Sequence, residues 1–208
     1  MIRVRVPFLI LCLLLSGFPL LSTSSSTNNS ISLDVMTPYD LILDQGGTVS
    51  DLNFDSDGTL YINNTAPLTI LNCQLIYRKR IIINATAPIT LINSLIYAYP
   101  NRYNNKEANT DIFGSSHLIA NDSDIGAIGA LNMYDNSILS LFNQSTSGGN
   151  VYGLNLHDNS SFSISNGRIG TNGITAIENT SLIITSTLVQ LGQRSNYLNQ
   201  PQITKGKC

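Results

Sequence analysis

Three acidic side chains recur at one position of successive sequence units, and their type would suit acid–base or calcium chemistry. Asp135, Asp158 and Glu178 each precede an Asn-Ser or Asn-Thr pair. We expect them to stack in a column along one edge of the fold, with Asp122 and Asp124 nearby. Clustered carboxylates bind calcium or act in polysaccharide cleavage. Asp residues in tight turns also bond the local backbone and face water, and we favour this structural role.

The other reactive residue types offer no complete set for catalysis. His117 and His157 are the only histidines and lie far apart in the chain, without the spacing of a zinc site. The sequence has no Gly-x-Ser-x-Gly elbow and no phosphate-binding glycine loop. We therefore predict no catalytic residue, no cofactor and no metal, and we lean towards a protein that is not an enzyme.

A tyrosine-rich segment is the better candidate for binding. Tyr97, Tyr99 and Tyr103 lie close together, with Arg102 among them. Aromatic rings present broad apolar faces on which sugar rings can stack, and the polar groups can bond hydroxyls. We expect these four residues to contact carbohydrate. In the alternative interpretation, Tyr97 and Tyr99 end a strand and the rest is a solvated loop.

Seven sites match the N-glycosylation pattern Asn-x-Ser/Thr. In a secreted protein this pattern marks sites for N-glycans on exposed loops, although a chain this rich in Asn, Ser and Thr also produces matches by chance. The sites are Asn28, Asn63, Asn84, Asn121, Asn143, Asn159 and Asn179.

Internal repetition indicates the elements that position these residues. Residues 60–70 read LYINNTAPLTI and residues 81–91 read IIINATAPITL, an offset of 21. A related unit occupies residues 131–141, 154–164 and 174–184, and residues 117–127 fit more loosely. Anchored on Ser123, Ser137, Ser160 and Thr180, the later spacings are 14, 23 and 20, and the first of these is too short for a full turn of chain.

The repeat predicts an all-β fold, a parallel β-helix (β-solenoid) with rungs of about 20 residues. Apolar residues alternate with polar ones as in strands, and Asn, Asp and Ser form the corners. A β-sandwich is the alternative, because Gly46-Gly47, Gly148-Gly149, Asn166-Gly167 and Asn172-Gly173 would suit hairpin turns. We expect these residues to point inward: Leu60, Ile62, Leu68, Ile70, Ile81, Ile83, Ile89, Leu91, Leu139, Leu141, Phe162, Ile164, Leu182 and Ile184.

On residues 60–97 and 118–184, the sequence resembles the parallel β-helix repeat family, the pectin-lyase-like architecture also seen in adhesin-like surface proteins. The match lies in the pattern apolar-x-apolar and Asn-x-Ser/Thr, and it implies an architecture. Residues 99–116 interrupt the repeat as its longest polar insertion.

Stacked corners also bear on glycosylation. Asn63 and Asn84 occupy one corner of consecutive repeats, and Asn159 and Asn179 share the corresponding corner later. Glycans one rung apart, about 4.8 Å, would crowd each other. We expect outward corners with uneven occupancy, in which Asn121 and Asn143, without an aligned neighbour, are modified more fully.

The N-terminal segment of the chain predicts export. Residues 1–24 read as a signal peptide, since Arg3 and Arg5 precede an apolar stretch, residues 8–21, that is too short for a membrane span. A signal anchor is the alternative. Residues 25–50 are expected to form a Ser/Thr/Asn-rich linker and N-terminal cap, residues 51–192 the solenoid, and residues 193–208 a polar tail.

Two cysteines remain after the expected cleavage, Cys73 and Cys208. An exported chain could form a disulfide between them. In a solenoid they lie far apart, so we favour no internal bridge, a small buried residue at Cys73, and a bond to another chain as an option for Cys208.

The composition limits the classes of binding partner that the chain can have. The chain of 208 residues has 42% hydrophobic and 12% charged residues and a net charge of −2. This hydrophobic content is sufficient to fill a core, and the sequence has no basic run that would bind nucleic acid.

We expect a secreted or cell-surface glycoprotein with a structural or adhesive role and no membrane span after signal removal. Its expected partners are surface polysaccharides, other surface proteins or further copies of itself. The alternatives are a filament subunit assembled by strand complementation, with Ile31–Val35 as the donated strand, and a small carbohydrate-active β-helix lyase or hydrolase.

Overall fold

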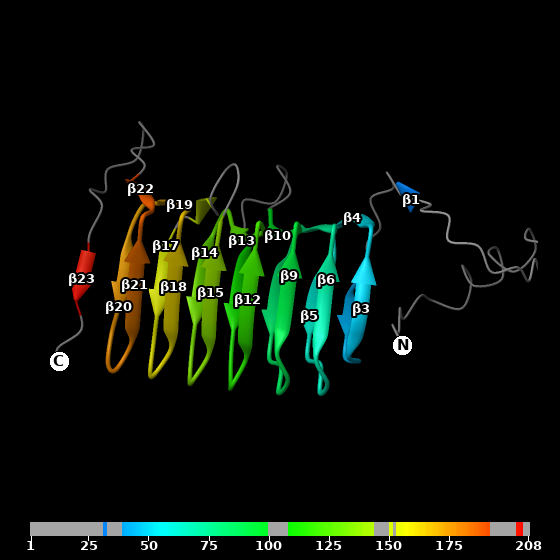
Figure 1. Ribbon diagram of the computed structural model, residues 1–208, viewed down its shortest axis with the longest axis horizontal. Helices are drawn as coiled ribbons and strands as arrows, with labels where there is room; N and C mark the ends of the chain where they lie inside the picture. Colours follow the sequence, from blue (N-terminus) through cyan, green and yellow to red (C-terminus); the bar gives the residue numbers. More distant parts are fainter. Residues whose placement is uncertain are drawn as a thin grey trace, which may run out of the picture.

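The protein is an all-β solenoid of about six turns in which every strand pairs in parallel with its neighbours. The computed structural model describes residues 31–32, 39–99, 108–143, 150–151, 153–191 and 203–205, and these residues contain no helix. Figure 1 shows the strands stacked side by side along the long axis of the molecule. The prediction of a β-solenoid is therefore confirmed, and the alternative β-sandwich is wrong.

Three sides enclose the core. The first sheet contains β2 (Leu41–Leu43), β5 (Thr59–Ile62), β8 (Arg80–Ile83), β11 (Asn109–Ile112), β14 (Ala130–Met133), β17 (Gly153–Leu156), β20 (Ile174–Ala176) and β23 (Ile203–Lys205). The second sheet contains β3 (Gly47–Ser50), β6 (Leu68–Leu71), β9 (Ile89–Ile92), β12 (His117–Asn121), β15 (Ile138–Phe142), β18 (Ser161–Ser165) and β21 (Ser181–Thr185).

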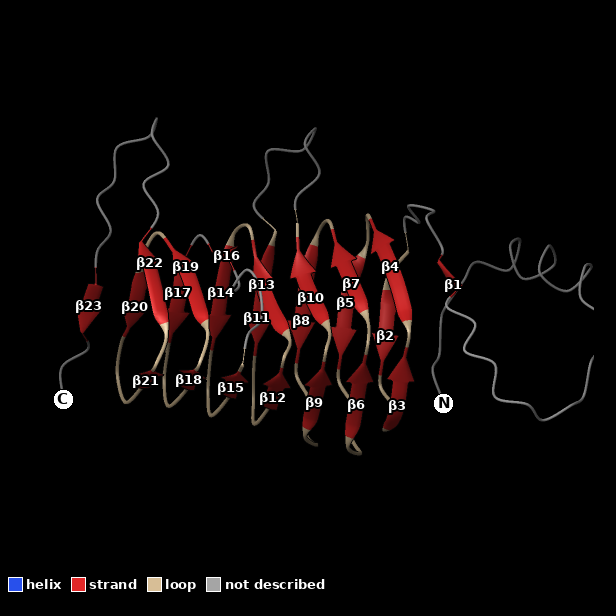
Figure 2. Ribbon diagram, turned by 45° about the horizontal axis from the view of Figure 1, so that its top comes forward, coloured by secondary structure: helices blue, strands red, loops and turns tan. Residues whose placement is uncertain are grey.

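The third side has two sheets, in line along the axis (Figure 2). One contains β1 (Ile31–Ser32), β4 (Leu52–Ser56), β7 (Gln74–Tyr77), β10 (Leu95–Ala98) and β13 (Asp124–Ala127). The other contains β16 (Asn150–Val151), β19 (Arg168–Thr171) and β22 (Leu188–Leu191). The sheets thus begin within the segments expected as linker and cap, and β23 pairs with β20 from the segment expected as tail.

The register repeats once per turn of chain. One column of the first sheet contains, in order, Ile62, Ile83, Ile112, Met133, Leu156 and Ala176. The longest of these turns, from Ile83 to Ile112, contains the insertion between β10 and β11. Residues 99–116 were expected to interrupt the repeat throughout, and this expectation is wrong for β11, which pairs with β8 and β14 in regular register.

The two corners that flank the second sheet are both polar and resemble each other in sequence. Ser116, rather than Ser123, precedes the strand that pairs with β15, because His117 lies opposite Ile138. Ser123 instead follows β12 at the corner that leads to the third side. The anomalously short spacing between Ser123 and Ser137 therefore came from aligning one corner with the other, since both corners carry Asp and Ser.

The core is a continuous column of aliphatic side chains, because one turn cannot bury its own apolar face and stacking closes it. The residues expected to point inward are all buried except Leu182 and Ile184, which pack against the core in the last turn and remain partly exposed. At the corner between the second sheet and the third side, Cys73, Ser94 and Ser123 form a buried inner column. The backbone N–H of Cys73 donates to Ser94 Oγ at 3.0 Å, and the N–H of Ser94 donates to Ser123 Oγ at 3.0 Å.

Tyr77 is a buried tyrosine in this core, packed near the Phe54 ring with centroids 5.9 Å apart. Its hydroxyl has no hydrogen-bond partner among the described residues. Burial, and secondarily Asp40, raise the pKa of Tyr77 above its ordinary value. The unfolded chain therefore loses this proton near pH 10 while the folded chain keeps it, and stability falls as the pH rises above about 10.

We predict that Tyr77→Phe raises the free energy of unfolding at pH 7 by about 1 kcal/mol, because the change removes a buried polar group without a partner. The variant should also lose less stability above about pH 10. Urea unfolding at neutral and alkaline pH measures both effects, with Tyr61→Phe on the outer face as the control. An unchanged alkaline loss in Tyr77→Phe would contradict the prediction.

Candidate functional site

A row of polar side chains runs along the outer face of the first sheet, one from each of three successive strands. Asp111, Asn132 and Asn155 lie opposite one another in β11, β14 and β17. Asn155 Nδ2 donates to Asn132 Oδ1, and Asn132 Nδ2 donates to Asp111 Oδ1, both at 2.8 Å. Arg80 Nε donates to Asp111 Oδ2. The row is therefore a chain of hydrogen bonds that ends on one carboxylate.

Asp111 is only 1% exposed although its side chain points away from the core. Its ion pair with Arg80 is half-covered, because the Arg80 side chain is 48% exposed. The hydrogen bond to Asp111 raises the pKa of Arg80. This arrangement fixes the Asp111 side chain in position.

An aromatic column borders this row. The rings of Phe113 and Tyr134 stack with centroids 4.9 Å apart at 8°, and the rings of Tyr134 and His157 stack at 4.9 Å and 12°. Burial raises the pKa of Tyr134, and Asp111 adds to the effect. Because the ring faces cover one another, the column presents ring edges to solvent. His157 belongs to this column, whereas His117 begins β12 in the second sheet.

Neither the polar row nor the aromatic column follows from the residue types alone. Asp111 lies in the segment that was expected to be an insertion, and its strand reads Asn-Thr-Asp-Ile, with one aliphatic residue. The signal that could have found it is the spacing from Ile112 to Met133, which equals the offset of 21 between the 60–70 and 81–91 copies.

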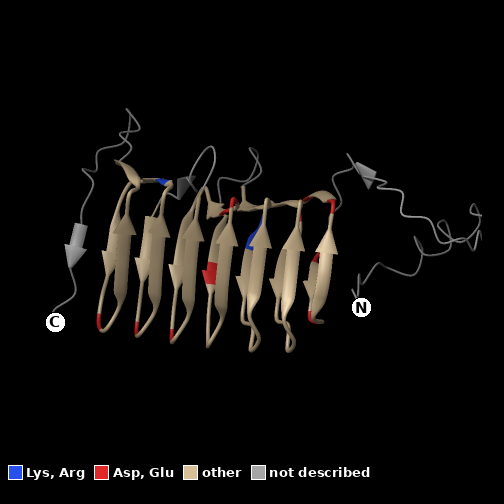
Figure 3. Cartoon of the chain, in the orientation of Figure 1, with Lys and Arg blue, Asp and Glu red and all other residues tan. Residues whose placement is uncertain are grey.

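The acidic column predicted at the corners exists, and its role is structural. Asp135, Asp158 and Glu178 adopt left-handed backbone angles, with φ of 59°, 59° and 65°. The Asp135 carboxylate accepts from the backbone N–H of Gly114, and the Asp158 carboxylate accepts from that of Asp135, both at 2.9 Å. Figure 3 shows acidic positions at the turns of consecutive coils. The carboxylates thus satisfy turn N–H groups.

The expectation that Asp122 and Asp124 lie near this column is wrong. Asp122 occupies the corner after β12, with φ of 48°, and Asp124 begins β13, so both lie at the opposite end of the second sheet's strands. The reason is the same as for Ser123: the corners at the two ends of the second sheet's strands resemble each other in sequence, so the sequence pattern does not tell them apart. Within the described ranges, no three His, Cys, Asp or Glu residues are grouped so that they could hold a metal ion.

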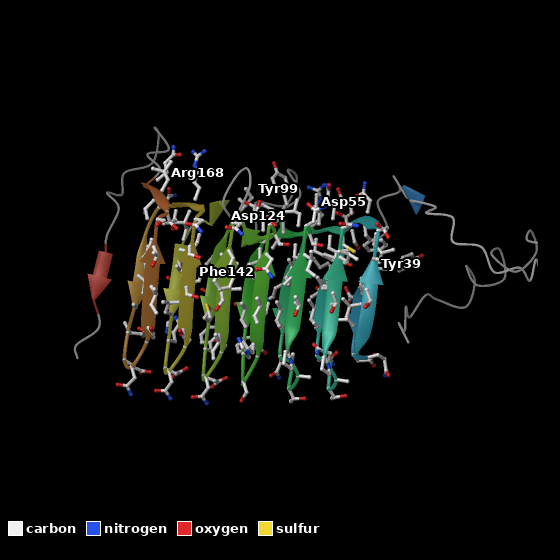
Figure 4. All side chains as sticks on the ribbon, viewed as in Figure 1. Tyr39, Asp55, Tyr99, Asp124, Phe142 and Arg168 are labelled. Carbon is white, nitrogen blue, oxygen red and sulfur yellow. The ribbon has the colours of Figure 1, made fainter. Side chains whose placement is uncertain are left out.

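The tyrosine cluster is partly described. The rings of Tyr97 and Tyr99 lie 6.5 Å apart and tilted by 37°, and the Arg78 guanidinium lies 5.1 Å from the centre of the Tyr99 ring. Arg78 also pairs with Asp55 on the adjacent strand. Figure 4 shows Asp55 and Tyr99 on the same side of the solenoid. Arg102 and Tyr103 lie outside the described residues, and Arg78 was not anticipated from the sequence.

The N-glycosylation candidates fall in different columns. Asn63, Asn84, Asn143, Asn159 and Asn179 are exposed, Asn121 is half-buried on β12, and Asn28 lies outside the described residues. Asn63 and Asn84 align with Phe113 in the aromatic column. Asn159 Nδ2 instead donates to Asn136 Oδ1 at 3.2 Å, and Asn179 Nδ2 donates to Asn159 Oδ1 at 3.4 Å, in a column slightly further along the turn.

Asn143 was expected to lack an aligned neighbour, and this is wrong. Asn166 Nδ2 donates to Asn143 Oδ1 at 3.4 Å, and both have left-handed backbone angles. They belong to a corner column that also contains Asn72 and Asn93. The sequence pattern did not reveal this column, because its members are single residues between two strands.

Cys73 is buried and unbridged, and Cys208 lies outside the described residues. A search of the described part of the chain for a helix that is long and apolar enough to span a membrane finds none. Comparison of the chain with protein-family models, with curated proteins and with solved structures gives no match.

Proposed function

We propose that the protein is a secreted or cell-surface glycoprotein with a structural or adhesive role, comparable to the adhesin-like members of the parallel β-helix architecture. The observation that carries this proposal is the solenoid itself. Its parallel strands stack along one axis and hold outward side chains in columns one strand apart, about 4.8 Å. Repeat proteins use such extended surfaces for binding.

The N-terminal sequence supports export. Arg3 and Arg5, the apolar stretch that follows and the Ser/Thr-rich segment match a secretory signal. The exposed Asn-x-Ser/Thr sites at the corners are accessible positions for glycans.

The filament alternative requires a strand that is free to leave. The strand proposed as donor begins with β1, which pairs with β4 of the same chain. Donation would cost this pairing, so the observation favours a self-contained solenoid over strand complementation.

Expression of the full chain in a eukaryotic secretory host, with an epitope inserted in the segment 100–107, tests the proposal. We expect antibody labelling of intact cells or recovery of the protein from the medium, with a mature N-terminus between Ser22 and Ser26 by mass spectrometry. Retention of the uncleaved chain inside the cells would contradict it. Adhesion of beads coated with the purified protein to cells, compared with beads coated with albumin, tests the adhesive role.

A further inference from the structure

The outer face of the second sheet combines exposed apolar side chains with hydroxyls and carries no formal charge. Its seven strands contain no Asp, Glu, Lys or Arg (Figure 3). Ile92, Phe142 and Ile183 nevertheless expose 38%, 39% and 54% of their surface. Single exposed apolar residues need no explanation, but several on one uncharged sheet face are typical of a binding surface.

The apolar residues near the centre form a strip along the solenoid axis. We define the apolar strip as one column of outward residues, which lie opposite one another in β6, β9, β12 and β15: Leu71, Ile92, Asn121 and Phe142. The amide of Asn121 interrupts the strip between Ile92 and Phe142. The position of Phe142 on this sheet is marked in Figure 4.

Polar columns border the apolar strip on both sides, and neither contains a basic residue among the described residues. On the sheet lies a column of hydroxyls interrupted by Ile119: Thr69, Thr90, Ser140 and Ser163. At the corner lies the column of amides: Asn72, Asn93, Asn143 and Asn166.

Hydrogen bonds fix both borders in place. Ser163 Oγ donates to Ser140 Oγ at 3.0 Å, and Asn93 Nδ2 donates to Asn72 Oδ1 at 3.0 Å. The parallel ladders hold the backbone beneath them. The surface is therefore preorganised, and its side chains lose little conformational entropy when a ligand binds.

The charges near the apolar strip select the kind of ligand. The described acidic groups at its border are Asp51 and Asp122, in the corner column, and no described basic residue belongs to either border. Anionic polymers are bound through Arg and Lys, and acidic groups repel them. A sugar ring, in contrast, offers an apolar C–H face and hydroxyl edges, which match an apolar strip between hydroxyls and amides.

The size of the face argues against a second copy as its occupant. Seven strands at about 4.8 Å spacing, each about five residues long at about 3.3 Å per residue, give roughly 500 Å². Stable protein interfaces bury about 800 Å² on each partner. A polymer chain needs only the strip and gains affinity from repeated contacts along it.

We propose that the apolar strip binds a neutral polysaccharide laid along the solenoid axis, with Phe142 packed against the C–H face of a sugar ring. This inference rests on the proposed adhesive role and names its ligand class and its face. It differs from the expectation from sequence, which placed carbohydrate contacts at Tyr97, Tyr99, Arg102 and Tyr103.

Sedimentation of the purified full chain with microcrystalline cellulose, chitin and insoluble mannan tests the proposal, with calcium polygalacturonate gel as the anionic comparison. The proposal requires that Asn121 carries no glycan, in contrast to the expectation from its Asn-x-Ser pattern, because a glycan there would lie across the strip. The secreted chain and the chain produced without N-glycosylation are therefore compared, and glycopeptide mass spectrometry measures the occupancy of Asn121. Full occupancy of Asn121 in the secreted chain would overturn the proposal. We expect retention by at least one neutral polymer and no preference for the anionic gel. Phe142→Ala should weaken retention about tenfold, the effect of one lost aromatic contact.

Ile177→Ala is the matched control, since Ile177 is 37% exposed and lies outside the second sheet. We expect it to bind like the parent chain, and circular dichroism verifies that both variants are folded. If Phe142→Ala does not fold, Ile92→Ala, 38% exposed in the same strip, replaces it. Binding to none of the neutral polymers, preference for polygalacturonate, or equal losses in Phe142→Ala and Ile177→Ala would overturn the proposal.

Light scattering after size-exclusion chromatography adds a separate outcome. A dimer that dissociates on Phe142→Ala would mean that a second copy covers the strip, and it would overturn the polysaccharide assignment. If the protein reaches the cell surface and adheres, but Phe142→Ala does not change its adhesion, the proposed function stands and only the assignment of this face is wrong. A protein retained inside the cell that still binds neutral polymer through Phe142 would reject only the proposed function.

Discussion

Replacement of Ile83 by alanine is expected to lower the free energy of unfolding by about 2–5 kcal/mol. The Ile83 side chain is completely buried in the aliphatic column, so its removal loses transfer energy and leaves a cavity between two neighbouring turns. Urea unfolding followed by circular dichroism measures the change.

The adjacent residue supplies the control. Ile82 has the same side chain on the same strand, but it points to the outer face and is only partly buried. We expect Ile82→Ala to cost less than about 1 kcal/mol. Because a shift of one residue exchanges the two faces of a strand, equal losses at Ile82 and Ile83 would show that the register of β8 is incorrect.

The second large effect is expected at Ser94, which links two turns inside the corner. Ser94 Oγ accepts the backbone N–H of Cys73 and lies 2.8 Å from the carbonyl oxygen of Ile92 and 3.1 Å from that of Ile70. Ser94→Ala leaves the buried N–H of Cys73 without a partner, so we expect a loss of about 1–3 kcal/mol.

Cys73→Ser is the matched substitution in the same inner column. Cys73 Sγ lies 3.2 Å from the carbonyl oxygen of Leu71 and 3.6 Å from that of Val49, which are the counterparts of the two carbonyls near Ser94. A hydroxyl can therefore replace the thiol, and we expect a change within about 1 kcal/mol. Chemical denaturation of both variants decides the matter, and a large loss in Cys73→Ser with none in Ser94→Ala would refute the role of the column.

The architecture was predictable because the two neighbouring copies at 60–70 and 81–91 repeat both the strand alternation and the corner residues. Stacked corners are the one arrangement that gives identical corner residues a common environment. The positions of single residues were less predictable where a turn departs from this pattern. Asp111 was not predicted, because its strand has one aliphatic residue and lacks the apolar alternation of the other strands. Asp122 was assigned to the wrong corner, because Asp and Ser occur at both corners of the second sheet.

The candidate binding surface was harder still to predict. The apolar strip combines Leu71, Ile92 and Phe142, which come from three different turns of the chain and are joined only by the strand register. Sequence clustering favoured Tyr97 and Tyr99 because they are neighbours along the chain. Side chains that gather across strands are found only once the register is known, and the insertion before β11 conceals that register in the sequence.

The equal register of turns that differ in length has a consequence for how such a chain can change. The turn from Ile83 to Ile112 contains the insertion and is longer than the turns on either side of it, yet the columns before and after it remain aligned. A tandem duplication of one regular unit would therefore lengthen the solenoid by one coil without disturbing its neighbours. Segments added between β10 and β11 would change only what projects from one corner. The number of solenoid turns and the size of the insertion between β10 and β11 can therefore change independently, while the aliphatic core stays the same.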